Sequence, residues 1–201
     1  MNPRNRGPSR RVFVATAAGL VGSLGLPLFL PSRVFGKEAP SNRLRVGQIG
    51  CGRIARVHDM PGVLNSDLAD TVAVCDLDTK RAGLGRELVE QSYQAKQRPA
   101  PKVAVYQDYR ELLSHPGLDA VVISTPDHWH AIIGIDAVHA GKDVYLQKPA
   151  SLTIAEGRAL SNAVQATGRI LQIGSQQRST VQFRYAAELV RNGRIGELRT
   201  V

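Results

Sequence analysis

From about residue 44 onward, short apolar runs alternate with longer stretches of helical pattern. The short runs predict strands, because they are brief and rich in β-branched residues, whereas the longer stretches predict helices. In chain order, the predicted strands are 44–49, 71–75, 102–106, 119–125, 143–146 and 169–173, with a further strand starting at 198. The predicted helices run from the glycines after residue 49 to about 64, then 78–93, 108–115, 128–140, 153–167 and about 180–192.

Several helix boundaries carry their own signals. Asp108 is a good N-cap residue for the brief third helix. Gly141 and Gly168 are good C-cap residues for the helices that precede them. Because strand and helix alternate throughout, the pattern predicts parallel strands joined by right-handed crossovers, with helices on both faces. The expected fold is therefore α/β, a doubly wound parallel sheet of the Rossmann-like kind.

A glycine turn follows the first predicted strand and opens a helix. Gly50, Gly52 and Ala55 satisfy the G-x-G-x-x-G/A pattern. In that pattern the first glycine allows a tight turn, the second lets the backbone approach a pyrophosphate, and the third small residue lets the helix pack on the strand. The helix N-terminus then faces the phosphate charge. Dinucleotide-binding residues are predicted here at Gly50, Gly52, Arg53 and Ile54.

The second predicted strand ends at Asp76, 24 residues past Gly52. A carboxylate at this place accepts hydrogen bonds from both ribose hydroxyls of a dinucleotide and repels a 2′-phosphate. Leu77 follows, where an arginine would bind that phosphate. The pattern therefore favours NAD, while Lys80 and Arg81 nearby leave NADP possible.

Composition excludes several classes of protein. The 201 residues are 43% hydrophobic and 21% charged, with two cysteines, which excludes wholesale disorder, a collagen-like repeat and a disulfide framework. The formal net charge is +9, but residues 1–36 contribute five arginines and no acid. The rest of the chain is only mildly basic and has no long basic run, so nucleic acid is not an expected partner.

The excess of arginine belongs to a leader. Arg10 and Arg11 precede a weakly apolar stretch from Val14 to Leu30, a pattern typical of a twin-arginine export signal. We expect a signal peptide over 1–36, cleavage after Gly36 and a linker over 37–43. An uncleaved anchor is the alternative, although glycines and a proline make this stretch a poor spanning helix. Export by this route follows folding in the cytoplasm, which disfavours a Cys51–Cys75 disulfide and predicts a periplasmic protein.

Four segments together resemble the Gfo/Idh/MocA oxidoreductases. They are the glycine turn 47–55, Ser124-Thr125-Pro126-Asp127-His128-Trp129-His130-Ala131, Gln147-Lys148-Pro149 and Gly174-Ser175-Gln176-Gln177-Arg178-Ser179. The resemblance covers about 44–201. It implies a dinucleotide-binding Rossmann domain over 44–174, then the start of a second α/β substrate domain over 175–201, whose remainder is missing from this chain.

The resemblance also implies residue roles. Thr125, Pro126 and His128 would lie beside the cofactor, and Lys148 near the nicotinamide and the reacting hydroxyl. Gln147 stands where the family usually has glutamate, and its amide can form hydrogen bonds but cannot balance the lysine charge. Gln176 is a candidate for contact with cofactor or substrate, with a structural role as the alternative.

The chemistry agrees with these roles. Hydride removal from a carbinol carbon leaves an alkoxide, which a positioned ammonium such as Lys148 stabilises. His128 and His130 form an H-x-H pair without acid or cysteine ligands nearby, so no metal site is expected. Whether the bond before Pro149 is cis stays open. No Asp/His pair for proton transfer follows residue 178.

The leading hypothesis is an exported NAD-dependent oxidoreductase acting on CH–OH groups of a sugar, polyol or related carbohydrate, with this chain mainly its nucleotide-binding part. The alternatives are an NAD-dependent glycoside hydrolase of the same family and a non-catalytic NAD- or sugar-binding protein. The expected partners are a small carbohydrate and the twin-arginine export machinery, with no stable membrane span and with homo-oligomers possible in the full-length form.

Overall fold

The computed structural model describes residues 42–99 and 101–200. The predicted signal peptide and all but the end of the predicted linker lie outside these residues. Within the described ranges, no helix combines the length and apolar character needed to cross a bilayer.

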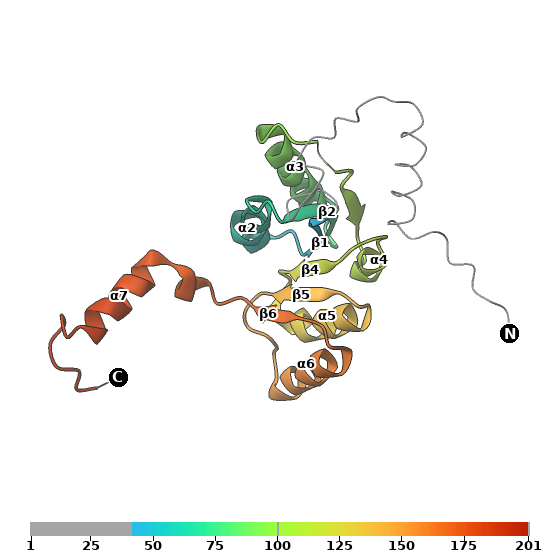
Figure 1. Ribbon diagram of the computed structural model, residues 1–201. Coiled ribbons are helices and arrows are strands. Elements are labelled where there is room, and N and C mark those ends of the chain that lie inside the picture. Colours follow the sequence, from blue (N-terminus) through green and yellow to red (C-terminus); the bar gives the residue numbers. More distant parts are fainter. Residues whose placement is uncertain (1–41, 100, 201) are drawn as a thin grey trace, which may run out of the picture. The chain divides into compact units, whose positions relative to one another are not determined.

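Six parallel strands form one sheet in the order β3-β2-β1-β4-β5-β6 (Figure 1). The strands are β1 Leu44–Ile49, β2 Ala69–Cys75, β3 Ala104–Tyr106, β4 Ala120–Ile123, β5 Asp143–Leu146 and β6 Leu171–Ile173. The chain winds outward from β1 to β3, returns to the centre at β4, and winds outward again to β6. The predicted doubly wound α/β fold is confirmed, and its switch point lies between β1 and β4.

Helices cover both faces of the sheet. They are η4 Ala55–Asp59 (a π-helical turn), α2 Met60–Leu64, α3 Thr79–Ala95, α4 Tyr109–Leu113, α5 Asp127–His139 and α6 Ile154–Thr167. After β6 come η5 Gln176–Ser179 (a 3₁₀ turn) and α7 Val181–Arg191, and α7 has no buried residue. One buried cluster joins the sheet to α4, α5 and α6, and a second joins it to η4, α2 and α3. The sheet is therefore the middle layer, as crossovers of one hand require.

Local signals explain where most helices begin and end. Asp78 and Asp108 cap α3 and α4 by accepting hydrogen bonds from backbone amides of the first turn. Thr153 and Glu156 form a reciprocal capping box at the start of α6. Gly168 closes α6 in the left-handed conformation, with φ of 64°. The predicted caps at residues 108 and 168 are thus confirmed.

Three predicted strands begin elsewhere: β2 begins at Ala69 rather than 71, β3 at Ala104 rather than 102 and β6 at Leu171 rather than 169. Three further predicted elements need correction. Strand β4 ends at Ile123, not at residue 125, because the backbone turns there. The Thr125 carbonyl then lies 2.9 Å from His130 Nε2 instead of joining the strand ladder. The helix after the glycine turn contains the π-helical turn η4 at Ala55–Asp59. Residues 198–200 form no strand, since a strand needs a neighbour for its backbone bonds and none of the described strands lies beside them.

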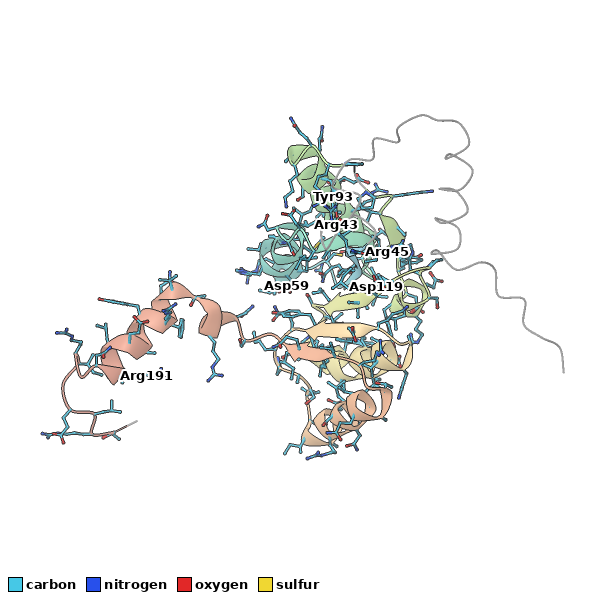
Figure 2. The ribbon with its side chains drawn as sticks, viewed as in Figure 1. Arg43, Arg45, Asp59, Tyr93, Asp119 and Arg191 are labelled. Atoms are coloured by element: carbon cyan, nitrogen blue, oxygen red, sulfur yellow. The ribbon has the colours of Figure 1, made fainter. Side chains whose placement is uncertain are left out.

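A charged cluster closes the amino end of the sheet. Asp70, at the start of β2, accepts hydrogen bonds from Tyr93 Oη and Arg98 Nη2, both at 2.8 Å, and Arg43 Nη1 lies 3.7 Å away. Figure 2 shows Tyr93 and Arg43 close together beside β2. Arg43 Nε is buried and has no hydrogen-bond partner among the described residues. The candidate site lies at the opposite, carboxyl edge, where the glycine turn follows β1.

Candidate functional site

The glycine turn lies against the carboxyl end of β4. Gly50 has φ of 83°, and a Cβ there would lie 2.7 Å from the carbonyl oxygen of Ser124. Its amide donates to the Cys75 carbonyl at 2.8 Å, which ties the turn to β2 as well. A side chain at residue 50 would thus be strained and would collide with β4. Only glycine fits this approach.

Gly52 faces open space instead. A Cβ on it would meet no atom within 4 Å. The helix begins at the next residue, Arg53, whose side chain is exposed, as is that of Ile54. The first amides of a helix lack acceptors within it, and they lie at the positive end of the helix dipole. The turn therefore presents bare backbone where an anionic group can approach.

Asp76 lies beside this turn. Its Oδ2 accepts a hydrogen bond from the Cys51 amide at 2.8 Å, and its Oδ1 accepts from the Asp78 amide at 2.9 Å. Leu77, next in the chain, is 79% exposed. The carboxylate thus holds the glycine turn in place, and it keeps lone pairs for further donors.

Cys51 anchors the turn from beneath. Its side chain is fully buried, and a Cβ on Gly85 of α3 would lie 2.7 Å from its Sγ, so the helix packs tightly on the thiol. Burial, and then the negative charge of Asp76, raises the pKa of Cys51 to about 12. Cys51 and Cys75 are both free thiols. They are core groups beneath the glycine turn, not nucleophiles.

Thr125 and His130 follow β4, on the side of the glycine turn away from Asp76. Thr125 Oγ1 is buried and has no hydrogen-bond partner in the described part of the chain. His130 is buried, and its two ring nitrogens lie 2.5 Å from the Pro149 carbonyl and 2.9 Å from the Thr125 carbonyl. His130 is thus a clamp between the β4 and β5 loops. The Lys148–Pro149 bond within the second loop is cis.

Lys148, Pro126 and His128 are exposed at the same edge of the sheet. The Lys148 amide donates to Gln147 Oε1 at 3.1 Å, and its ammonium is on the surface. The His128 ring lies 6.2 Å from the ring of Trp129. Gln176 lies farther along, after β6, in the left-handed region with φ of 34°. Such conformations of residues other than glycine concentrate at binding sites.

A pocket of about 580 Å³ adjoins this edge. Tyr145 from β5, Gln147 just after it, Gln172 from β6, Gln176 from η5 and Asp59 from η4 contribute to its lining. Burial raises the pKa of Tyr145, and the charge of Asp59 adds to the rise. The structure thus divides the predicted residues into two groups. The turn and Thr125 lie at the switch point, with Asp76 beside the turn at the end of β2, whereas Gln147 and Gln176 share the neighbouring pocket.

Sequence reasoning missed a polar network behind the site. Gln48 Nε2 donates to the Gly50 carbonyl at 2.9 Å and to Ser124 Oγ at 3.0 Å. Ser124 Oγ donates to Asp59 Oδ2, and Gln147 Nε2 donates to Asp59 Oδ1, both at 2.6 Å. A glutamine inside the apolar run 44–49 was the available signal, because a buried amide needs partners.

No group of three or more metal-binding side chains gathers within 42–99 and 101–200. The free groups fit a dinucleotide better than a metal. Open backbone at Gly52, a helix N-terminus and an unpaired Thr125 hydroxyl are what a phosphate-bearing ligand would satisfy.

Comparison with known proteins agrees with this geometry. Residues 44–175 match the family model described as oxidoreductase family, NAD-binding Rossmann fold. A scyllo-inositol 2-dehydrogenase (NAD(+)) of Bacillus subtilis (strain 168) is 30% identical over 157 residues, which cover 78% of this chain and 42% of the relative. A glycosyl hydrolase family 109 protein 1 of Shewanella sp. (strain ANA-3) is 31% identical over 166 residues, covering 82% and 36%.

A solved structure shows the same fold. KijD10, a 3-ketoreductase from Actinomadura kijaniata in complex with NADP, matches with a TM-score of 0.66 and 27% identity, covering 79% of this chain and 47% of that one. The chain thus spans less than half the length of these three proteins. The family match over residues 44–175, together with the glycine turn at the switch point of the sheet, identifies the chain as a member of the Gfo/Idh/MocA oxidoreductase family that carries its NAD-binding Rossmann domain.

Proposed function

We propose that this protein is an NAD-dependent oxidoreductase that oxidises a CH–OH group of a sugar, polyol or related carbohydrate, and that the described chain is its cofactor-binding part. One observation carries the proposal. The open backbone at Gly52 and the unpaired, buried Thr125 hydroxyl flank the same switch point in a domain of an NAD-binding family. Family relatives that act on inositol support the substrate class.

Each group in the crevice has a role in this proposal. The amides that open the helix at Arg53 would hold the diphosphate, and Asp76 would accept hydrogen bonds from the adenosine ribose. Thr125 Oγ1 would gain the partner that it lacks within the described chain. A carboxylate at residue 76, followed by exposed Leu77, supports NAD over NADP.

Lys148 is the proposed catalytic residue. Bound NAD⁺ supplies a hydride acceptor, so the carbinol carbon becomes a carbonyl carbon while the hydroxyl proton leaves to a base or to solvent. The Lys148 ammonium would stabilise the negative charge that develops on the substrate oxygen. Its backbone is held by Gln147, while the side chain stays exposed and able to reach a substrate.

Titration calorimetry of the full-length protein with NAD and NADP tests the first step. Saturable binding that favours NAD is expected, and absence of binding to either dinucleotide would refute the proposal. NADH formation over a panel of sugars, inositols and sugar acids then tests the reaction. A Lys148→Met variant should bind NAD like the parent and lose turnover by about a hundredfold or more, as loss of an electrostatic group in the transition state predicts.

A glycoside hydrolase that uses NAD catalytically is the second candidate, because relatives of similar identity are glycosyl hydrolase family 109 proteins. Chromogenic glycosides separate the two functions. Release of the chromophore without net NADH favours the hydrolase, whereas stoichiometric NADH from free sugars favours the dehydrogenase.

Export to the periplasm through the twin-arginine route is also proposed, on the strength of Arg10, Arg11 and the weakly apolar stretch after them. Residues 1–43 fused to a folded reporter should direct it to the periplasm. Replacing both arginines by lysine should retain the reporter in the cytoplasm, and an unchanged periplasmic fraction would contradict this route.

A further inference from the structure

Asp59 provides a carboxylate in a place that local sequence does not suggest. It is the last residue of the π-helical turn η4, and π-helical turns are frequent at functional sites. Figure 2 labels it beside the helix that continues into α2. Its two oxygens accept hydrogen bonds of 2.6 Å, one from Ser124 after β4 and one from Gln147 after β5. Both donors belong to the segments that form the cofactor edge.

Gln147 connects Asp59 to Lys148 through hydrogen bonds. Its side chain is 4% exposed, with Nε2 directed to Asp59 and Oε1 accepting from the Lys148 amide at 3.1 Å. The orientation of the amide is therefore determined, because only Nε2 can donate to a carboxylate and only Oε1 can accept from an amide. A continuous chain of hydrogen bonds leads from Asp59 to the backbone of Lys148.

The residue types at positions 59 and 147 depend on each other. A glutamate at residue 147 would bring two carboxylates within 2.6 Å, where like charges disfavour each other and one must hold a proton. Without the Asp59 carboxylate, the buried Gln147 Nε2 would lose its acceptor. Glutamine at 147 is therefore the residue that suits an aspartate at 59.

We propose that Asp59 is a positioning residue that supplies the negative charge of the catalytic edge and, through Gln147, fixes the backbone of Lys148. The proposal rests on the function proposed above for Lys148. Gln147 carries no charge, and in this proposal Asp59, 88 residues earlier in the chain, supplies the negative charge instead. The effect of Asp59 on the pKa of Tyr145 is consistent with a charge directed toward the pocket.

The test is a charge exchange in the full-length protein, with the Asp59→Asn, Gln147→Glu and double variants. Titration calorimetry with NADH reports affinity. Unfolding in denaturant reports stability. Steady-state kinetics on the best substrate of the panel separates kcat from KM. An Asp67→Asn variant, at an 83% exposed carboxylate, controls for loss of a negative charge elsewhere.

We expect Asp59→Asn to lower kcat by about tenfold or more, as loss of a charge-assisted bond predicts, with NADH affinity within about threefold of the parent. Gln147→Glu should also lower kcat. In that background Asp59→Asn should raise kcat, because one carboxylate and one amide again face each other. The control should match the parent.

Parent-like kcat in Asp59→Asn would overturn the proposal, and so would a double variant no more active than Gln147→Glu. Should Asp59→Asn alone fail to fold, the comparison of Gln147→Glu with the double variant decides. Failure of the parent itself to bind NADH would instead refute the proposed function, so the two failures are distinguishable.

Discussion

The amide of Cys51 donates a 2.8 Å hydrogen bond to the carboxylate of Asp76. This bond joins the glycine turn after β1 to the end of β2. The same carboxylate accepts from the Asp78 amide. Asp76 therefore stabilises the glycine turn in addition to its proposed contact with a ribose. Its loss should affect both the shape of the turn and that contact.

Replacing Asp76 by asparagine should weaken NAD binding by about tenfold or more, because a charge-assisted hydrogen bond is worth about 1.5–3 kcal/mol. An asparagine can satisfy only one of the two amides, since its Nδ2 would face a donor. The ratio of NAD to NADP affinity should fall as well, because the 2′-phosphate is no longer repelled. Titration calorimetry with both dinucleotides measures this. Glu87→Gln, at an exposed acid on α3, is the control, and an unaltered NAD affinity in Asp76→Asn would contradict the assignment.

The two glycines of the turn should respond differently to the same substitution. Gly50→Ala places a methyl group 2.7 Å from the Ser124 carbonyl at φ of 83°, so we expect a loss of unfolding free energy of at least about 1–3 kcal/mol. Gly52→Ala meets no atom, so stability should stay within about 0.5 kcal/mol of the parent, as for an unconstrained surface change.

Dinucleotide affinity should nevertheless fall in Gly52→Ala, because the methyl group occupies the approach to the backbone. Denaturant unfolding and calorimetry on the two variants check both effects. A Gly52→Ala variant with full NAD affinity would argue against a diphosphate at this turn.

His130 should be essential to the two loops that it joins. His130→Leu removes the ring nitrogens that lie against the Thr125 and Pro149 carbonyls. Since a neutral imidazole donates to one of these carbonyls, the loss should cost about 1–3 kcal/mol. His139→Leu, at an exposed position in the last turn of the same helix, should cost less than about 0.5 kcal/mol. Denaturant titration measures the difference, and equal effects of the two substitutions would refute the clamp.

Alkaline pH should destabilise the domain. Burial raises the pKa of Cys51 and Cys75 from 9.0 to about 12, and that of Tyr93 and Tyr109 from 10.0 to about 12. Between about pH 9 and 12 the unfolded chain therefore releases protons that the native state retains, and the free energy of unfolding falls as pH rises.

Each of these groups contributes a slope of up to about 1.4 kcal/mol per pH unit in that window. Below pH 9 the contribution is fully present. Denaturant unfolding at pH 8, 9, 10 and 11 measures the slope, and Cys51→Ala should make it shallower. At neutral pH both thiols should resist modification in the folded state, and rapid labelling of the native protein would contradict their protonated, buried character.

Much of the fold was predictable because it depends on local periodicity. The run 143–146 predicted β5 with its observed bounds, and the helix predicted over 153–167 differs from α6 only in that Thr153 is its cap. The predicted strand 119–125 was too long, since β-branched and small residues continue past Ile123 while the backbone already turns toward α5. Local pattern indicates extended residues but does not show where the ladder stops.

The candidate site divides in the same way. The glycine pattern and Asp76 are signals that lie within one β-α-β unit, so the sequence alone indicated a dinucleotide crevice. Asp59 and Gln147 are 88 residues apart, and their contact exists only because β4 and β5 lie side by side next to β1. Likewise, nothing local indicates that His130 reaches the carbonyls of residues 125 and 149.

The sequence by itself determined the alternation of strands and helices, the turn at Gly50–Gly52 and the acid that follows β2, because each depends on the conformational preferences and spacing of neighbouring residues. The tertiary structure alone decided which polar groups meet. The order of the strands brings the carboxyl ends of β1, β4 and β5 together. There Gln48 donates to Ser124, and Ser124 and Gln147 both donate to Asp59, since an unpaired polar group away from water is costly.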